Sequence, residues 1–475
     1  MSEKFYITTP IYYPNADLHM GHAYSSVLAD ILARYHKGKG ADTFFLSGTD
    51  EHASKVAKAA LAAGKSPKEF VDEKATSFKK FYADLSVGFT DFIQTSDQEK
   101  HWPGAIEFWN RLVKAGKIYK KSYSGLYCVG CEEFKTEKDL VDGLCPLHNQ
   151  KPEELKEENY FFKFSDYGDE LKKLISSDAL RIVPASRKNE ILSFIESGLE
   201  DVSFSRPRKE PVWGIPVPGD DSQVMYVWCD ALTNYANAVG FGWDETLFKK
   251  WWPADIHLLG KDILRFHAAI WPAMLLAAGL PLPKTIFAHG FITSGGKKMS
   301  KTIGNVIDPK ELIAEYGADA VRYYIAREIS HFDDGDITLE KFKEAYNANL
   351  ANGLGNLTSR IMKMATSYID TPIDVKGDPH YKFGEYEKAM TELRVNDAAN
   401  IAWEAIGELD REIQETEPFK IFKVDPDNAR EIVRGLVVGL SKIVPMLVPI
   451  MPNTADKIRS AIETHSMPAS LFLRK

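Results

Sequence analysis

The sequence predicts an α/β chain in which a parallel sheet is split by an insertion and followed by a helical bundle. Strand–helix–strand patterns occur near the start of the chain and again from residue 257. Residues 115–225 differ in composition, and residues beyond 345 show a helical period. At 475 residues the chain exceeds the roughly 250–300 residues at which a single hydrophobic core stops growing, so we expect several domains.

The first strand–helix–strand pattern lies in the opening fifty residues. An apolar run at residues 5–7 is followed by a turn with Pro10 and Pro14, and then by apolar residues at helical spacing across 27–35. Residues 43–46 form a second apolar run. Strand, helix and strand at this spacing make a βαβ unit, which indicates a parallel sheet.

The same pattern returns late in the chain. Residues 257–260 are typical of a strand, residues 262–278 of an apolar helix, and residues 286–289 of another strand. The stretch between the two patterns is rich in lysine and glutamate, contains a cysteine cluster and includes a turn-rich segment at 205–211. An insertion that splits one sheet domain is the simplest account of this order.

The last part of the chain is helical in period. Leu350, Leu354, Leu357 and Ile361 share one helix face, and a similar pattern recurs at 432–440. These patterns predict a C-terminal helical bundle.

Composition excludes several classes of protein. Hydrophobic residues make up 44% and charged residues 27%, as in folded globular proteins. No stretch approaches the ~20 apolar residues of a membrane span, and the N-terminus has no secretory pattern, so we expect no membrane contact and a cytoplasmic location. The net charge of -8 means that any nucleic acid must be met by local basic patches.

A first candidate for phosphate binding lies at residues 14–22, between the first strand and the first helix. A helix N-terminus presents unpaired N–H groups, Gly21 permits close approach, and His19 and His22 can donate to phosphate oxygens. The motif alone also fits a turn with two hydrogen-bonded histidines. A second motif is needed to decide between these interpretations.

That second motif lies at residues 295–302, after the strand that ends near residue 292. Two glycines permit a mobile loop, and the ammonium groups of Lys298 and Lys301 can neutralise charge that develops on a triphosphate. Alone, the run fits a solvated basic loop. Both motifs in this order, each on a connection between strand and helix, indicate an ATP site.

The cysteine cluster predicts a metal site. Cys128, Cys131, Cys145 and His148 form two short-spaced pairs separated by a loop, a pattern that suits one tetrahedral Zn²⁺ with three sulfur ligands and one nitrogen. Four filled positions leave no vacancy for catalysis, which favours a structural role. The alternative is a group of free thiols. We interpret Cys229 as a small buried apolar residue.

The two phosphate motifs resemble the signatures of class I aminoacyl-tRNA synthetases, a His-apolar-Gly-His motif and a Lys-Met-Ser-Lys-Ser loop. Here the second ends in Thr302, which keeps the hydroxyl. The resemblance implies a split Rossmann fold that binds ATP with Mg²⁺, without a covalent enzyme intermediate. It also implies catalytic roles for His19, His22, Lys298 and Lys301. The implied ATP-binding residues are His19, Gly21, His22, Lys298, Ser300 and Lys301.

Within this class, the chain resembles the methionyl-tRNA synthetase family over nearly its whole length. The motifs that carry the resemblance are residues 9–13, 48–52, 226–231, 260–262, 266–267 and 271–272. The implied substrates are ATP, L-methionine and tRNA(Met), with Asp50 at the substrate ammonium. The implied methionine pocket consists of Ile11, Tyr13, Asp50, Trp228, Ala231, Leu232, Tyr235, Phe266, His267 and Trp271. A thioether suits an aromatic cage, and a Tyr or His donor near sulfur could reject aliphatic isosteres.

The family resemblance also assigns the zinc knuckle and the bundle. It implies a structural zinc in an inserted connective domain, and anticodon reading by Asn356, Arg360 and Phe419, where Phe419 replaces the usual Trp. The expected domains are the first catalytic half (1–115), the connective insertion (116–225), the second catalytic half (226–325), a stem-contact linker (326–345) and the anticodon-binding bundle (346–475).

Other functions fit only part of the pattern. A small-molecule nucleotidylyltransferase shares the first phosphate motif but does not explain the cysteine cluster or the bundle. Synthetases for leucine, isoleucine or valine resemble much longer chains with an editing insertion, and one for cysteine requires zinc ligands in the amino-acid pocket. A catalytically silent RNA-binding relative has no reason to keep Asp50, His19, His22, Lys298 and Lys301 together. Without an appended β-barrel module before Lys475, we expect a monomer.

Overall fold

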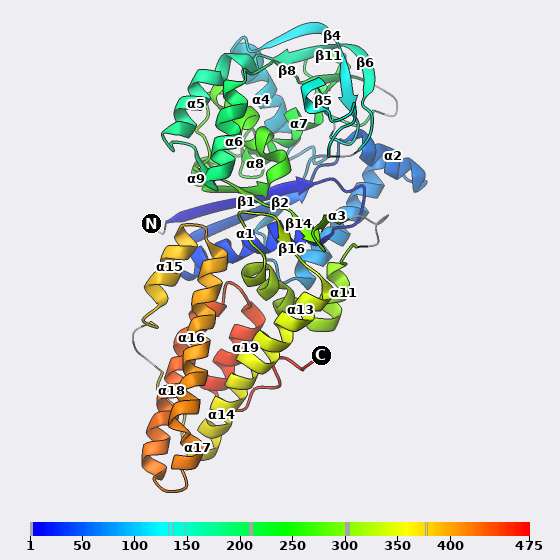
Figure 1. Cartoon of the computed structure of the whole chain (residues 1–475). Coiled ribbons are helices and arrows are strands. Elements are labelled where there is room, and N and C mark those ends of the chain that lie inside the picture. Colours follow the sequence, from blue (N-terminus) through cyan, green and yellow to red (C-terminus); the bar gives the residue numbers. More distant parts are fainter. Residues whose placement is uncertain are drawn as a thin grey trace. The chain divides into compact units, whose positions relative to one another are not determined.

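The computed structural model describes residues 3–475 apart from 132, 136, 148, 209–211, 300–304, 376 and 378. The chain forms two compact units (Figure 1). The first unit comprises Met1–Leu18, Asp42–Lys80 and Phe89–His289, and the second comprises His19–Ala41, Phe81–Gly88 and Gly290–Lys475. Each unit is therefore assembled from three separate stretches of the chain.

A six-stranded parallel sheet forms the centre of the first unit. Its strand order is β3-β2-β1-β12-β13-β7, so β1 pairs with β2 on one side and with β12 on the other. Ile7 of β1 lies opposite Phe45 and Ile256. The strands are β1 (Lys4–Tyr12), β2 (Asp42–Thr49), β3 (Asp91–Gln94), β7 (Arg181–Val183), β12 (Ile256–Gly260) and β13 (Thr285–His289). The parallel sheet predicted from the two βαβ patterns is confirmed.

Strand β7 comes from the stretch predicted as an insertion. It pairs with β13 at the edge of the parallel sheet, where Ile182 lies opposite Ile286 and Val183 opposite Phe287. The side chains of Ile182 and Val183 are buried. The chain thus returns briefly to the parent sheet before leaving it again.

The rest of that stretch forms mainly antiparallel structure. β4 and β6 pair along ten residues, from Ile118 opposite Phe162 to Tyr127 opposite Glu153, and Cys128 ends β4. The two small sheets have the orders β5-β4-β6-β8 and β10-β11-β9. Their strands are β4 (Ile118–Cys128), β5 (Glu133–Lys135), β6 (Glu153–Phe162), β8 (Val202–Ser203), β9 (Ser205–Pro207), β10 (Pro216–Val217) and β11 (Asp220–Met225).

The helix predicted at 262–278 is irregular. It begins as a 3₁₀ turn at Lys261–Ile263, widens into a π-helix at Phe266–Ile270 and ends as α10 (Trp271–Ala277). The other helices of this unit are α2 (Ser54–Ala62), α4 (Trp102–Lys114), α5 (Gly168–Ser176), α6 (Ala185–Glu196), α7 (Val227–Ala231), α8 (Asn234–Asn237) and α9 (Glu245–Trp251), and α3 (Pro67–Asp84) runs on into the second unit. A π-turn changes which side chains face inward, and such turns are frequent at functional sites.

The second unit combines α1, a small three-stranded sheet and the C-terminal helices. The sheet has the order β15-β14-β16. The strands are β14 (Ile292–Ser294), β15 (Lys297–Lys298) and β16 (Gly335–Asp336). The helices are α1 (Met20–Gly38), α11 (Pro309–Tyr316), α12 (Ala318–Tyr323), α13 (Leu339–Ala345), α14 (Asn356–Tyr368), α15 (Phe383–Thr391), α16 (Val395–Thr416), α17 (Pro418–Ile421), α18 (Pro426–Leu447) and α19 (Pro452–Glu463).

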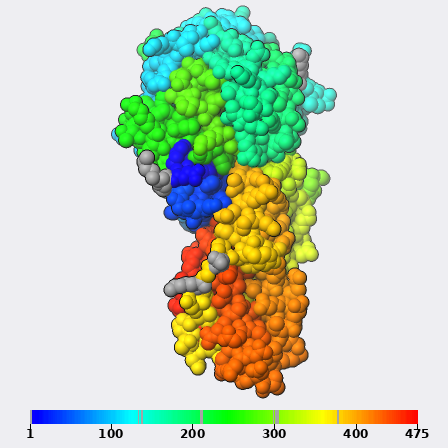
Figure 2. Space-filling model, turned by 90° about the vertical axis from the view of Figure 1, so that its left-hand side faces the viewer, coloured from blue at the N-terminus to red at the C-terminus, as the bar shows by residue number. Residues whose placement is uncertain are grey.

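The helical C-terminal region predicted from periodicity is confirmed. In α16, buried residues recur at Ala398, Ala402, Ala405 and Leu409, which is the spacing of one helix face. α14, α16 and α18 contact one another, and Figure 2 shows these yellow to orange-red segments side by side. Within the described part of the chain, no helix is both long and apolar enough to cross a membrane.

A buried ion pair lies at the centre of the second unit. The fully buried Arg322 of α12 contacts Asp30 of α1 at 2.7 Å and donates to the carbonyl oxygens of Pro449 and Ile450 at 2.8 and 2.9 Å. Asp30 also accepts from the backbone N–H of Gly88 at 2.9 Å. Because a buried charge must be paired and hydrogen-bonded, this contact joins α1, the 81–88 segment and residues 449–450, which follow α18.

Candidate functional site

Two histidines, His19 and His22, cap the N-terminus of α1. His19 Nδ1 accepts from Gly21 N–H at 3.1 Å, and His22 Nδ1 accepts from His19 N–H at 3.0 Å. The rings lie 3.9 Å apart. A nitrogen that accepts carries no hydrogen, so each ring has its N–H at Nε2. Burial, together with His19, lowers the pKa of His22, which keeps it neutral.

The second phosphate motif begins as a hairpin in the same unit. β14 and β15 are joined through Gly295 and Gly296, whose φ values of 63° and 71° place both in the left-handed region that glycine adopts readily. Asp336 of β16 accepts from Gly296 N–H at 2.8 Å and from Thr293 Oγ1 at 3.0 Å. The backbone bond from Gly296 is the main cause of the lowered pKa of Asp336. Ser300, Lys301 and the side chain of Lys298 lie outside the described residues.

A cavity in the first unit lies where three adjacent parallel strands end. β1 contributes Pro10 and Ile11, Asp50 follows β2, and Ile263 and His267 follow β12. The carboxyl ends of parallel strands are the usual place for a ligand in such sheets. The lining consists of Pro10, Ile11, Asp50, Trp228, Ala231, Leu232, Asn234, Tyr235, Ile263 and His267. The open volume is about 20 Å³.

Seven of the ten residues predicted for the amino-acid pocket line this cavity, and three do not. Phe266 stacks on the ring of Trp228, with 3.9 Å between the ring centroids. Trp271 is fully buried and donates from Nε1 to His257 at 3.2 Å. The Lys55 ammonium lies over the Tyr13 ring, 3.4 Å from the ring centroid. The π-helix between Phe266 and Trp271 gives their side chains directions that helical spacing in the sequence does not reveal.

Tyr235 and His267 form a hydrogen-bonded chain in the cavity wall. Tyr235 Oη lies 2.7 Å from His267 Nε2, and His267 Nδ1 lies 2.9 Å from the carbonyl oxygen of Ile263. A carbonyl only accepts, so His267 carries its hydrogen on Nδ1 and its Nε2 accepts from the Tyr235 hydroxyl. Burial lowers the pKa of His267 to about 4, so the ring is neutral at pH 7.

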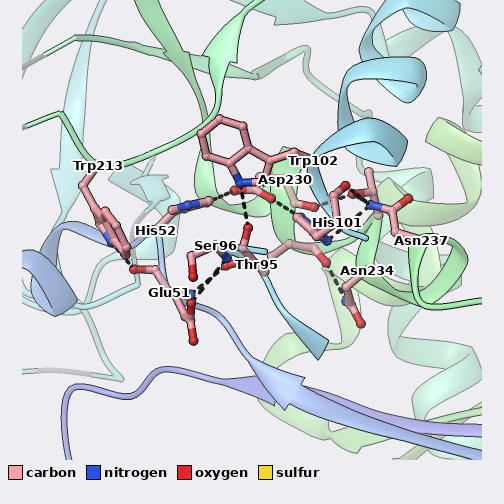
Figure 3. A network of polar contacts seen from close by, with 12 residues as sticks. Glu51, His52, Thr95, Ser96, His101, Trp102, Trp213, Asp230, Asn234 and Asn237 are labelled. Atoms are coloured by element: carbon pink, nitrogen blue, oxygen red, sulfur yellow. Dashed lines mark hydrogen bonds and ion pairs between the residues drawn. The ribbon is translucent and has the colours of Figure 1, made fainter. Parts of the chain in front are cut away.

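A buried carboxylate beside the cavity holds two further histidines. Asp230 of α7 accepts from His52 Nδ1 and from His101 Nε2, each at 2.5 Å, and Figure 3 shows it between the two rings. All three side chains are buried. His52 and Asp230 lie in sequence motifs that carry the family resemblance, but no role followed from them there, and nothing in the sequence singles out His101. Such long-range pairing has no local signal.

A second buried carboxylate, Glu51, lies next to His52 in the chain. It accepts from Thr49 Oγ1 at 2.6 Å and from Gln94 Nε2 at 3.0 Å, and its backbone N–H donates to Thr95 Oγ1 at 2.9 Å. Its backbone carbonyl accepts from Trp213 Nε1 (Figure 3). These bonds fix the loop that follows β2, and therefore the backbone that carries Asp50 and His52.

Three of the four predicted metal ligands come together. The sulfur atoms of Cys128, Cys131 and Cys145 all lie within 4.8 Å of one another, and those of Cys131 and Cys145 are 3.6 Å apart. Bonds of ~2.3 Å from a tetrahedral Zn²⁺ put two sulfurs at roughly 3.8 Å, so the spacing fits a metal-bound thiolate group. His148 lies outside the described residues.

The residues predicted to read a nucleotide lie in the C-terminal helices. Asn356 begins α14 and is exposed, and Arg360 lies one turn later, where it contacts Asp410 of α16 at 2.7 Å. Phe419 of α17 is 44% exposed. An aromatic ring so exposed is available to stack on a ligand, whereas Arg360 is at present engaged by a carboxylate.

Comparison with known proteins identifies relatives along the whole chain. A model of the family described as class I tRNA synthetases (M) matches residues 5–154 and 137–362. The chain is 40% identical to the methionine–tRNA ligase of Thermotoga maritima, over 99% of this chain and 77% of that protein. It is 42% identical to the methionine–tRNA ligase of Caldanaerobacter subterraneus, over 96% of this chain and 74% of that protein.

Solved structures agree with these relatives. The Mycobacterium tuberculosis methionyl-tRNA synthetase in complex with methionyl-adenylate has a TM-score of 0.88 at 35% identity, covering 99% of this chain and 98% of that chain. The free form of the Mycobacterium tuberculosis protein has a TM-score of 0.84 at 32% identity, covering 100% and 99%. The mixed α/β fold with a helical C-terminal region is therefore shared.

We predict that the protein loses stability as the pH falls from 6.5 towards 4, partly because of His267. The unfolded chain takes up a proton near pH 6.5, whereas the buried ring resists protonation until about pH 4, so acid favours the unfolded state. This one group accounts for on the order of 2 kcal/mol between pH 7 and pH 5. Urea unfolding at both pH values should show a smaller pH effect in His267→Gln. An equal pH effect in wild type and variant would contradict the assignment.

Proposed function

The chain belongs to the methionine-specific family of class I aminoacyl-tRNA synthetases, and on that premise we propose that it attaches L-methionine to tRNA(Met) in two steps driven by ATP. The observation that carries the proposal is the match along nearly the whole chain to methionine–tRNA ligases at about 40% identity. The cavity at the carboxyl ends of β1, β2 and β12 supports it, because seven of its ten lining residues are those that the family resemblance implies.

We assign the cavity to the amino acid. Asp50 is buried in its wall and offers a carboxylate to the substrate ammonium, and Trp228 offers a polarisable face to the thioether. The cavity admits roughly one water-sized sphere, which is less than a methionine side chain needs. Binding therefore requires the walls to move apart, and the Trp228 ring, which stacks on Phe266, forms part of those walls.

The hydrogen bonds of Tyr235 and His267 bear on how methionine is selected. Sequence reasoning suggested a Tyr or His donor to the sulfur, but the Tyr235 hydroxyl donates to His267 Nε2 and the His267 Nδ1–H donates to Ile263. Both hydrogens are already engaged. We therefore attribute the selection of methionine chiefly to the shape and polarisability of the cavity wall. The hydrogen bond to His267 holds Tyr235 in place in that wall.

For the first step, we assign the two phosphate motifs to ATP. A carboxylate oxygen of methionine attacks the α-phosphorus, the bond to the β-phosphate oxygen breaks, and pyrophosphate leaves with its Mg²⁺. The α1 N-terminus and the Nε2–H groups of His19 and His22 suit phosphate oxygens, and Gly21 leaves room there. Lys298 and Lys301, with Ser300 between them, would stabilise charge on the leaving pyrophosphate.

For the second step, a hydroxyl of the terminal tRNA ribose attacks the methionyl carbonyl, and AMP leaves as the acyl bond to phosphate breaks. We assign the anticodon to the C-terminal bundle, with Asn356 and Arg360 on α14 and Phe419 on α17 as readers. Arg360 would exchange its contact with Asp410 for a base edge. The split Rossmann domain, the connective insertion and the boundaries of the five domains remain predictions, as do the monomeric state and the cytoplasmic location.

We assign a structural zinc to Cys128, Cys131, Cys145 and His148. The close approach of the three sulfurs supports this, because their spacing matches that of thiolates bound to one tetrahedral Zn²⁺. A closed set of three sulfurs and one nitrogen stabilises the local fold and offers no open position for catalysis. The site would hold together the end of β4 and the loop that carries Cys145.

We predict methionine-dependent exchange between ATP and pyrophosphate, measured with each of the twenty amino acids, and methionine should be the best substrate by far. Lys301→Ala should slow the exchange at least ~100-fold with methionine affinity near normal, because its ammonium acts on charge present only in the transition state.

Lys297→Ala is the matched control for that measurement, since it removes a neighbouring charge from the same hairpin and should exchange at a near-normal rate. No exchange with methionine would refute the proposed function. A Lys301→Ala protein that reacts normally but binds methionine weakly would place the loop at the amino acid instead.

We predict one zinc per chain, retained through purification and counted by elemental analysis. Cys128→Ser should lower the zinc content, because it removes one of four ligands from a closed site. Cys229→Ser is the matched control: it alters the one cysteine outside the cluster and should leave the zinc content unchanged. Protein without zinc, or equal zinc in both variants, would refute the site.

We predict that anticodon reading and amino-acid activation separate by mutation. Phe419→Ala should lower the efficiency of tRNA charging by ~5- to 150-fold, because it removes a stacking surface, while pyrophosphate exchange stays normal. Arg360→Ala should also relax discrimination against a changed first anticodon base. Phe419→Trp should charge tRNA at least as well as wild type.

Tyr381→Ala removes another exposed ring from the same bundle and serves as the control for the loss of aromatic surface. It should charge tRNA normally. If Phe419→Ala and Arg360→Ala both charge wild-type tRNA normally, the anticodon site lies elsewhere.

A further inference from the structure

Asp230 holds two histidines at the centre of a buried polar network (Figure 3). Its Oδ2 accepts from His52 Nδ1 and its Oδ1 from His101 Nε2, both at 2.5 Å. The Trp213 and Trp102 rings lie 5.3 and 6.1 Å from the His52 ring. The carboxylate is fully buried, so these two donors replace the water that it lost on folding.

The network has one consistent hydrogen-bonding pattern. Burial alone would raise the pKa of Asp230, but the two imidazoles outweigh it and hold that pKa at about 2, so the carboxylate is ionised. His101 donates from Nε2, and its carbonyl oxygen accepts from the Asn237 amide at 3.0 Å. Thr233 Oγ1 donates to the Asp230 carbonyl at 2.7 Å. The aspartate is thus held by both its side chain and its backbone.

Asp230, His52 and His101 come from three different segments of the chain. Two of these segments also supply residues of the cavity wall. His52 lies two residues after Asp50, and Asp230 lies between Trp228 and Ala231 on α7. Asp50, Trp228 and Ala231 line the cavity, whereas Asp230, His52 and His101 do not. The third segment is the start of α4, which follows His101.

We propose that Asp230 is a positioning residue for the amino-acid half of the reaction, because its bonds to His52 and His101 fix the distance between the Asp50 carboxylate and the α7 wall. This inference rests on the proposed function. An ammonium must reach Asp50 while the thioether reaches Trp228, so a change in the separation of these two groups weakens both contacts at once. ATP makes neither contact and should not sense the change.

Asp255 provides a matched comparison within the same unit. It is also a buried carboxylate, accepting from Tyr6 N–H at 2.7 Å and contacting Lys284 at 2.7 Å. It lies just before β12, at the amino end of the parallel sheet, whereas the cavity lies at the carboxyl end. Loss of its charge should lower stability without affecting methionine.

The deciding experiment measures KM for methionine and KM for ATP in pyrophosphate exchange. Asp230→Asn keeps the shape but can accept only one of the two N–H donors, so we expect the methionine KM to rise at least ten-fold and the ATP KM to stay within two-fold. The preference for methionine over norleucine, in which a methylene replaces sulfur, should fall. Asp255→Asn should leave both KM values within two-fold of wild type.

A second pair of variants keeps the test decisive if Asp230→Asn does not fold. His101→Gln places an amide N–H near the position of Nε2 and should keep the methionine KM near that of wild type. His101→Leu has a similar volume without the donor and should raise the methionine KM as Asp230→Asn does. Equal methionine KM values for these two variants would overturn the inference.

Two further outcomes separate this inference from the proposed function. If the wild-type protein exchanges with methionine but Asp230→Asn keeps the wild-type methionine KM, or raises both KM values alike, the positioning role is wrong and the function stands. If the wild-type protein shows no exchange with methionine, both fall together.

Discussion

The pairing of β1 on both its edges is the constraint on which the first unit depends. β1 lies between β2 and β12, although β12 begins more than two hundred residues after β1 ends. Only this arrangement puts the residue after β2, the end of β1 and the turn after β12 around one cavity, as Asp50, Ile11 and His267. The strands are largely apolar because the sheet is buried, and polar side chains within it, such as Thr8 and His257, hydrogen-bond to each other. The intervening stretch also supplies Asp50, Trp228 and Tyr235 to the cavity wall, and it returns to the parent sheet where β7 pairs with β13.

Buried charge imposes a second constraint in each unit. Asp230 in the first unit, and Arg322 with Asp30 in the second, are fully buried, and each makes several hydrogen bonds or ion pairs. Such groups add little net stability when paired, but losing one partner leaves an uncompensated charge in a site without water. Their value is geometric: alternative arrangements of the joined segments would leave a charge unpaired. Segments distant in the sequence are thus held in one arrangement.

Sequence reasoning succeeded where the signal was local and failed where it was not. Apolar runs located β1, β2, β12 and β13, and short motifs brought Asp50 and Trp228 to the same cavity wall. The three-residue strand β7 is too short to show a period. The π-helix at Phe266–Ile270 inserts an irregular turn, and Trp271 lies in the core rather than in the cavity wall that the family resemblance implied. His101 was missed because its partner Asp230 is 129 residues away.

Backbone groups fix the hydrogen positions of three imidazoles in the proposed sites, and this decides what each ring can do. Gly21 N–H donates to His19 Nδ1 and His19 N–H donates to His22 Nδ1, so both rings present Nε2–H as a donor, which suits an anion. At His267 the backbone partner is a carbonyl, so the hydrogen is on Nδ1 and Nε2 accepts instead, which suits a hydroxyl. The lowered pKa values of His22 and His267 keep both rings neutral near pH 7, so each ring retains one donor nitrogen and one acceptor nitrogen. The same residue type therefore offers a donor suited to an anion in one place and accepts from a tyrosine in another, and the local backbone sets the difference.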